Sequence, residues 1–295
     1  MSETPPKAAK GMREARLLGS DHHDVGSLAS IAEAEAAITL SRGGALKTYS
    51  HTEANEDTAL FALGAGGSLV AVADGHSGAS GSEAIANYLL QSCAEPWTAE
   101  EAPGFDDSTW PQTALDTVYA SGRAVLERAA EIGVPPAPST LSVALARPDL
   151  DTLFWLSAGD SHVFLTEQGY TRDVGWSSLG HKRAYYLGYE AATREAMEST
   201  FVWGSIPLSA LSAVVLATDG LSESGIGFPN PSAAIEESAE NTAHQPSDVR
   251  PLEFAKHLSY ATLKIHQKHR AGDNLACAIL DLRDPRSPRV DESSL

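Results

Sequence analysis

The sequence is short of positive charge and contains no long apolar run. Its 295 residues hold 21 Lys and Arg against 39 Asp and Glu, a formal net charge of −18. A field of that sign repels phosphate backbones, so we expect no nucleic-acid partner. Apolar runs such as residues 211–217 are far shorter than the ~20 residues that a bilayer span requires, so we also expect no membrane partner.

Cysteine is scarce as well, with only Cys93 and Cys277 in the whole chain. Two cysteines are too few for a disulfide framework, and each lies in an otherwise apolar segment. The first residues show no apolar stretch behind a basic start, so they do not resemble a secretory signal. We therefore expect two buried, reduced thiols in a cytoplasmic protein.

What the chain does contain is enough apolar sequence for one large core. It is 42% hydrophobic and 20% charged, which is the range of globular domains. We find no long linker, low-complexity block or internal repeat, and we predict one domain over residues 31–283. A flexible polar leader (1–30) and a loose tail (284–295) are expected on either side.

Short runs rich in Val, Leu and Ile predict eight strands, at residues 37–40, 59–63, 69–73, 141–146, 153–158, 163–166, 214–218 and 275–282. Apolar residues at helical spacing predict three longer helices, at 82–95, 111–132 and 252–269. Turn signals such as residues 64–68 join strands directly, as in hairpins, and no strand–helix–strand alternation is seen. The pattern favours an α+β domain with antiparallel sheets and helices on the outside.

Five aspartates stand where a predicted strand begins or ends: Asp57, Asp74, Asp160, Asp219 and Asp273. Taken singly, each is readily explained as a turn residue, because Asp bonds its own backbone in turns. The sequences Asp74-Gly75 and Asp219-Gly220, however, repeat one pattern, an apolar strand followed directly by Asp-Gly. If the sheets bring these strand ends together, several carboxylates share one cleft.

Such a cluster needs compensation, since two unit charges 4 Å apart repel by ~4 kcal/mol at an effective dielectric near 20. Either some carboxyl groups take up protons or the site binds cations. An all-oxygen ligand set favours hard ions, and no contiguous calcium-binding loop is present, so we expect Mg²⁺ or Mn²⁺. Two such ions roughly 3.5–4 Å apart can share a hydroxide that attacks a phosphate ester in line.

Several short motifs follow one another along the chain: Asn55-Glu56-Asp57, Val72 to Gly78, Ser139-Thr140, Ala158 to Ser161, Leu216 to Leu221 and Gly272-Asp273-Asn274. In this order they resemble the motifs of the metal-dependent protein phosphatases of the PPM (type 2C) family. The resemblance covers residues 39–282. It implies an αββα sandwich, in which two central antiparallel sheets are flanked by helices and the metals lie at one end.

The resemblance also implies roles for individual residues. Asp74 would bridge two Mn²⁺ or Mg²⁺ ions, and Asp160 would serve a weaker third ion. His76 would protonate the leaving oxygen of a serine or threonine side chain, a contribution of typically 10²–10⁴-fold. The implied metal ligands are Asp57, Asp74, the Gly75 carbonyl, Asp219, Asp273, Asp160 and, through a water, Glu56.

One departure from the family pattern concerns the substrate. The family usually carries an Arg five residues before the first Asp, where it grips the substrate phosphate, and this chain has Thr52 there. A hydroxyl cannot replace a bidentate guanidinium. Candidate replacements are Arg42, Lys47, His51 and the cluster His181-Lys182-Arg183; the alternative is that all of them are solvated surface charges.

The sequence thus predicts a monomeric, cytoplasmic serine/threonine phosphoprotein phosphatase that uses a hydroxide bridging two Mn or Mg ions. Two alternatives remain open: a catalytically weak relative that binds and regulates a phosphoprotein, and a hydrolase of small phosphate esters. We find no Ser/His/Asp arrangement that supports covalent catalysis, and we expect His162 to point to solvent.

Overall fold

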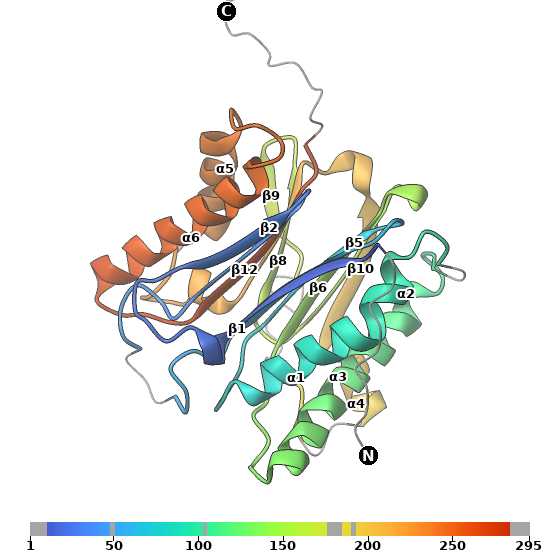
Figure 1. Cartoon of the computed structure of the whole chain (residues 1–295), viewed down its shortest axis with the longest axis horizontal. Coiled ribbons are helices and arrows are strands. Elements are labelled where there is room, and N and C mark those ends of the chain that lie inside the picture. Colours follow the sequence, from blue (N-terminus) through green and yellow to red (C-terminus); the bar gives the residue numbers. More distant parts are fainter. Residues whose placement is uncertain (1–10, 48–50, 103–104, 176–184, 190–192, 284–295) are drawn as a thin grey trace, which may run out of the picture.

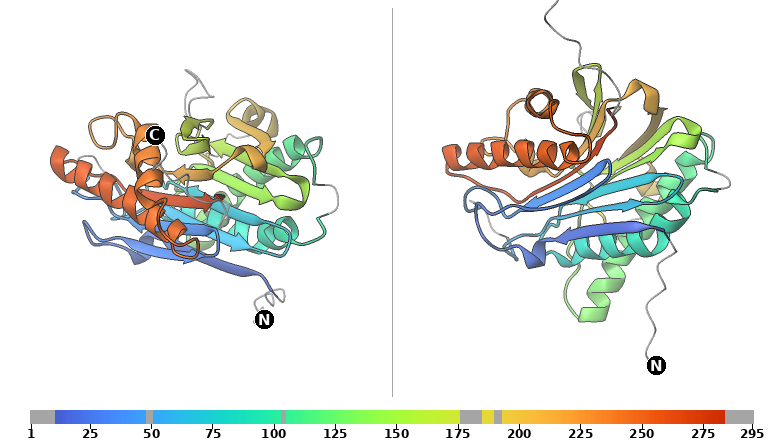
Figure 2. Two further views of the ribbon diagram at one scale, coloured as in Figure 1. Left: turned by 90° about the horizontal axis from the view of Figure 1, so that it is seen from above. Right: turned by 45° about the horizontal axis from the view of Figure 1, so that its top comes forward.

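The computed structural model describes residues 11–47, 51–102, 105–175, 185–189 and 193–283. Two six-stranded antiparallel sheets pack face to face, and helices cover the outer face of each (Figures 1 and 2). The strand order is β1-β4-β5-β6-β7-β10 in the first sheet and β2-β3-β12-β11-β8-β9 in the second. This confirms the expected α+β class and the αββα sandwich.

The first sheet consists of β1 (Arg13–Leu18), β4 (Thr58–Leu63), β5 (Ser68–Ala73), β6 (Leu141–Arg147), β7 (Thr152–Ala158) and β10 (Phe201–Pro207). The second consists of β2 (Ala29–Glu33), β3 (Ala36–Ser41), β8 (His162–Glu167), β9 (Tyr170–Asp173), β11 (Ala213–Ala217) and β12 (Leu275–Asp281). The α-helices are α1 (Ser80–Tyr88), α2 (Ala94–Thr98), α3 (Trp110–Ile132), α4 (Arg194–Glu198), α5 (Pro231–Thr242) and α6 (Arg250–His269).

The central strands are buried on both faces, which explains why they are almost continuously apolar. In β5, Leu69 and Ala71 contact the core under the helices of the first sheet. Val70 and Val72, on the opposite face, join the core between the two sheets. A third core lies between the second sheet and helices α5 and α6. Alternate residues of one apolar run therefore serve two different layers.

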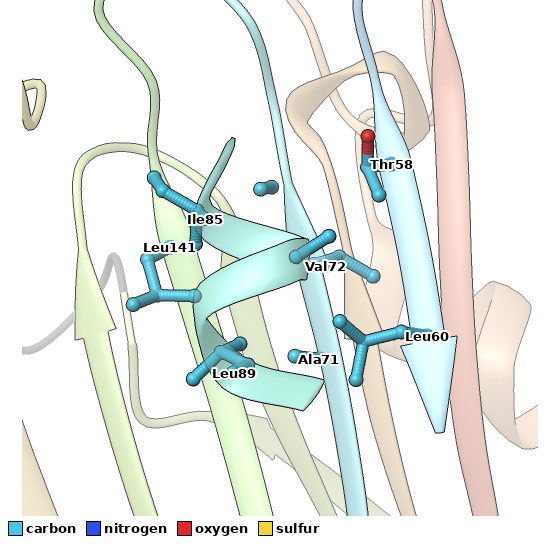
Figure 3. Close-up of a pocket in the computed structure, with 9 residues that line it drawn as sticks. Thr58, Leu60, Ala71, Val72, Ile85, Leu89 and Leu141 are labelled. Carbon is cyan, nitrogen blue, oxygen red and sulfur yellow. The ribbon is translucent and has the colours of Figure 1, made fainter. Parts of the chain in front are cut away.

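Helix α1 is fixed tightly on the first sheet (Figure 3). Ile85 on α1 and Leu89, directly after its end, pack against Leu60, Ala71 and Leu141 on three adjacent strands, and no room is left for a water molecule. Because α1 follows closely on the turn at the end of β5, this packing also holds that turn in place.

All eight predicted strands are confirmed, and so are the helices predicted at 111–132 and 252–269. The helix predicted at 82–95 is divided into α1, a π-helical turn (Leu89–Cys93) and α2. The hairpin predicted at residues 64–68 joins β4 to β5. None of the helices in the described part of the chain is long and apolar enough to cross a membrane.

The prediction of a flexible leader is wrong for residues 13–18. These residues form β1, which pairs with β4 along the edge of the first sheet. Leu17 is buried in the core between the sheets, whereas Arg13, Glu14 and Arg16 are not. The domain therefore starts before residue 31. Residues 1–10 and 284–295, which include the predicted tail, lie outside the described residues.

Candidate metal centre

The sheet pairing brings the ends of distant strands to one end of the sandwich. Thr58 at the start of β4 pairs with Ala73 at the end of β5, so Asp57 and Asp74 lie at the same sheet edge. In the second sheet, Asp219 follows the end of β11, beside the start of β12.

The carboxylates of Asp74, Asp160 and Asp219 meet in space. Each offers an oxygen atom that lies within 4.8 Å of those of the other two. Asp57 and Asp273 are more deeply buried, with 1% and 4% of their surface exposed. Repulsion from both carboxylates raises the pKa of Asp74, so they lie within electrostatic range of the other three.

Asp74 is held by its backbone. Its N–H donates to Thr140 Oγ1 at 2.9 Å, and its carbonyl accepts from the Thr140 N–H at 2.9 Å. The Ser139 hydroxyl donates to the same carbonyl at 2.8 Å. The Ser139-Thr140 motif therefore fixes the position of the central aspartate.

A lysine of the chain lies inside the acidic cluster. The Lys47 ammonium is 3.1 Å from Asp273 Oδ1, and both side chains are only 5% exposed. Burial disfavours the charged form of Lys47, but the carboxylates of Asp273, Asp57 and Asp74 outweigh it and raise the lysine pKa. Lys47 thus carries a permanent positive charge at neutral pH.

One ammonium does not compensate all the carboxylates. Burial raises the pKa of Asp57 to about 8, although Lys47 and a 2.7 Å hydrogen bond from Thr218 oppose the rise. The pKa values of Asp74 and Asp219 are raised well above the ordinary range, first by burial and then by neighbouring carboxylates. Without further positive charge, protons are retained in the site.

The donor set fits a hard divalent cation. Asp160 Oδ1 is buried and has no hydrogen-bond partner among the residues that the structure describes. An unsatisfied buried oxygen is unfavourable unless a cation or a water supplies the missing contact. Together with Asp74 and Asp219 it forms an all-oxygen group of the kind that Mg²⁺ and Mn²⁺ prefer.

The two Asp-Gly pairs are explained by close packing. A Cβ atom at Gly75 would lie 2.4 Å from the Glu56 carbonyl oxygen, and one at Gly220 would lie 1.9 Å from the Asn274 carbonyl oxygen. Only glycine admits these approaches. The metal-binding role of the Gly75 carbonyl stays a prediction.

His266 holds the Asp219-Gly220 turn by hydrogen bonding. Its Nε2 lies 2.8 Å from the Gly220 carbonyl, and its Nδ1 accepts from the Gly44 N–H at 3.2 Å. Burial lowers the pKa of His266, which favours the neutral ring that these two bonds require. No motif in the sequence pointed to this role for His266.

Glu56 and Asn274 fasten the loops around the site. Glu56 Oε1 accepts from the N–H groups of Thr52 and Glu53, each at 2.9 Å. Asn274 Oδ1 accepts from the Glu56 N–H at 2.9 Å, and its amide donates to the Ala54 carbonyl at 3.1 Å. The structure thus shows Glu56 as a loop cap, and its action on a metal through water stays a prediction.

His76 lies exposed beside the cluster, directly after Gly75. Its ring stacks on that of Tyr186, with centroids 5.0 Å apart and an angle of 19° between the rings. The Tyr186 hydroxyl donates to Asp160 Oδ2 at 2.7 Å. Burial and the Asp160 carboxylate raise the pKa of Tyr186, so it remains a donor. Tyr186 was missed from sequence.

The expectation that His162 points to solvent is wrong. It is buried, with Nδ1 2.7 Å from Asp173 Oδ2 and Nε2 2.6 Å from Ser222 Oγ. This order of groups is that of a Ser/His/Asp array. However, the N–H groups of Ser222 and Glu223 donate to the Asp219 carbonyl at 2.7 and 2.6 Å. They are therefore not free to stabilise an oxyanion, and the array fastens the Asp219 turn to β8.

The candidate replacements for the missing arginine differ in their placement. Thr52 is exposed to solvent, whereas the side chain of Lys47 is buried against Asp273. The Arg42 guanidinium donates to the His23 carbonyl at 2.8 Å. The cluster at residues 181–183 lies outside the described residues.

Residues 47–259 match the family model described as protein phosphatase 2C. No curated protein sequence matches the chain.

Solved structures share the fold at low sequence identity. The catalytic domain of the serine/threonine protein phosphatase PstP in complex with two manganese ions is 18% identical, with a TM-score of 0.58 over 88% of this chain and 100% of that one. The Mycobacterium tuberculosis phosphatase PstP/Ppp is 18% identical, with a TM-score of 0.55 over 87% and 99%. The S. agalactiae serine/threonine phosphatase is 16% identical, with a TM-score of 0.55 over 83% and 98%.

The close contact at Gly220 yields a first prediction. Gly220→Ala should destabilise the fold by about 1–3 kcal/mol and weaken Mn²⁺ binding, because the added methyl group displaces the Asp219 turn from Asn274. Denaturant unfolding and calorimetric Mn²⁺ titration measure the two effects. Gly225→Ala is the control: its methyl group enters open space at a φ of +77°, so stability falls through backbone strain while Mn²⁺ binding persists. Unchanged Mn²⁺ affinity in Gly220→Ala would contradict this account.

The raised carboxyl pKa values yield a second prediction. Asp57 titrates near 3.8 when unfolded and at about 8 in the fold, so the folded state binds more protons between these limits. The stability that this proton confers is present at low pH and is lost as pH rises. In EDTA, the Tm should therefore fall from pH 5 to pH 8, and Mn²⁺ should abolish the fall. Asp57→Asn should make the fall in EDTA shallower, because only Asp74 and Asp219 then keep raised pKa values. A Tm in EDTA that rises over this range would refute the assignment.

Proposed function

We propose that this chain, which belongs to the protein phosphatase 2C family, is a metal-dependent phosphatase of phosphoserine and phosphothreonine in proteins. The observation that carries the proposal is the convergence of the Asp74, Asp160 and Asp219 carboxylates within 4.8 Å of one another. The solved structures named above, which are described as serine/threonine phosphatases, support the same reaction class.

We propose a pair of Mn²⁺ or Mg²⁺ ions as the cofactor, with a weaker third. When bound, such ions offset the charge of carboxylates and phosphoryl oxygens and lower the pKa of water. The residues proposed to hold them are Asp57, Asp74, the Gly75 carbonyl, Asp219, Asp273, Asp160 and, through a water, Glu56.

His76 is the proposed general acid. Its exposed ring lies next to the Asp74-Gly75 turn, where a leaving serine or threonine oxygen could take its proton. Tyr186 orients the ring by stacking and is itself anchored to Asp160. Because an alkoxide is a poor leaving group, protonation matters more for a phosphoserine or phosphothreonine than for a phenyl phosphate.

A cavity of about 430 Å³ beside the cluster is large enough for a phosphorylated side chain. Asp160 and Asp219 line one part of it, and Ser222, Glu223 and Phe228 line another. This cavity is the proposed entry for substrate.

Thr52 favours a second candidate function. Without a guanidinium at this position, a cleft with the full aspartate set could accept small phosphate esters, or could bind a phosphoprotein with little turnover. The first assay below distinguishes these activities from the main proposal.

Both cysteines are free and buried in the fold. Since a disulfide is not used for stability, we propose that the protein works in a reducing, cytoplasmic compartment, as a monomer.

The central prediction concerns Asp74. The protein should hydrolyse a phosphothreonine peptide with Mn²⁺ and not with EDTA, and Asp74→Asn should lower the rate at least about a hundredfold. Asp107→Asn, at an exposed residue before α3, should leave the rate unchanged.

Turnover of p-nitrophenyl phosphate alone would favour the small-ester function. Absence of all turnover with metal bound would favour the regulator.

A further prediction separates the role of His76 from metal binding. His76→Ala should lower kcat for the phosphothreonine peptide by about 10²–10⁴-fold, because the leaving alkoxide loses its proton donor. The loss with p-nitrophenyl phosphate should be much smaller, since that leaving group needs little protonation. Equal losses on both substrates would rule out the general-acid role.

A further inference from the structure

We propose that Lys47 is an internal counter-ion of the aspartate cluster, which competes with a divalent cation at Asp57 and Asp273 and so sets the metal affinity. The inference rests on the metal-dependent function proposed above. Lys47 lies outside the motifs that carry the family resemblance.

The backbone forces Lys47 into the site. The Gly272 N–H donates to the Leu46 carbonyl at 3.1 Å, and Lys47 pairs with Gly272 in a short parallel bridge. A Cβ atom at Gly272 would lie only 1.9 Å from the Ala45 carbonyl oxygen, so the two segments are in tight contact. Lys47 therefore reaches Asp273 in a fixed register, unlike a surface lysine that samples many rotamers.

The compensation by Lys47 is uneven. Asp273 receives the Lys47 ammonium directly, and Asp57 receives the Thr218 hydroxyl and the field of Lys47. The field of Lys47 also reaches Asp74, which forms an open group with Asp160 and Asp219, in which Asp160 Oδ1 lacks a partner among the described residues.

The ion pair adds a cost to metal binding at Asp57 and Asp273. A divalent cation there has to displace the Lys47 ammonium, since two positive charges at one carboxylate repel each other. The affinity for that cation is therefore lower than the aspartates alone would give.

The same contact argues against Lys47 as the phosphate-gripping cation. At 5% exposure and 3.1 Å from Asp273, its ammonium would have to leave its partner to reach a substrate. Binding of substrate by Lys47 is therefore the competing outcome in the experiment.

The test compares Lys47→Met with the wild type by calorimetric titration with Mn²⁺ and by thermal unfolding in EDTA and in saturating Mn²⁺. We expect the Mn²⁺ that competes with Lys47 to bind at least about tenfold more tightly in the variant. The Tm in EDTA should fall, because Asp57 and Asp273 lose their counter-ion. The gain in Tm on adding Mn²⁺ should exceed that of the wild type. Lys264→Met, at an exposed lysine of α6, should behave as the wild type.

A double variant guards against failure of Lys47→Met to fold. Adding Asp273→Asn removes both members of the ion pair and should restore the Tm in EDTA toward the wild-type value. If the double variant is no more stable than Lys47→Met, Lys47 and Asp273 do not form the proposed ion pair.

Two other results would overturn the inference: unchanged Mn²⁺ affinity in Lys47→Met, or a raised KM for the phosphopeptide with unchanged Mn²⁺ affinity. Failure of the proposed function looks different. Wild-type protein that binds Mn²⁺ but turns over no phosphate ester would refute the phosphatase activity, while the binding and unfolding results would still decide the role of Lys47.

Discussion

Mutual repulsion among five buried or half-buried aspartates is the constraint on which the site depends. The strands that carry them are fixed by sheet pairing, so the carboxyl groups cannot relieve the repulsion by moving apart. The fold offsets this repulsion in three ways: a raised pKa that favours the protonated form of Asp57, the ammonium of Lys47, and an open group of oxygens suited to a divalent cation. In the proposed phosphatase reaction, bound divalent cations have to replace the retained protons.

The surroundings of the site are built to hold these charges in place. Thr140 fixes the backbone of Asp74, Asn274 joins the loop before β4 to the start of β12, and His266 supports the Gly220 turn. Each of these contacts joins segments far apart in sequence. Backbone carbonyl oxygens lie so close to Gly75 and Gly220 that no side chain fits there, which explains why each aspartate is followed by glycine.

Central strands and the aspartates at their ends could be predicted from sequence, because strands buried on both faces are continuously apolar and their ends are marked by turn residues. β1 was missed because an edge strand with Arg13, Glu14 and Arg16 facing outward looks polar. The parts of the site that escaped prediction are pairings across long separations. No spacing rule links Lys47 to Asp273 or Tyr186 to Asp160, since only the tertiary fold makes them neighbours.

The most direct test of the central claim is a crystal structure of the protein grown with Mn²⁺ and measured at the manganese absorption edge. The account predicts anomalous density in contact with the Asp74 carboxylate, with Asp160 and Asp219 turned toward it. Crystals that contain Mn²⁺ elsewhere but show no anomalous density at Asp74 would contradict it.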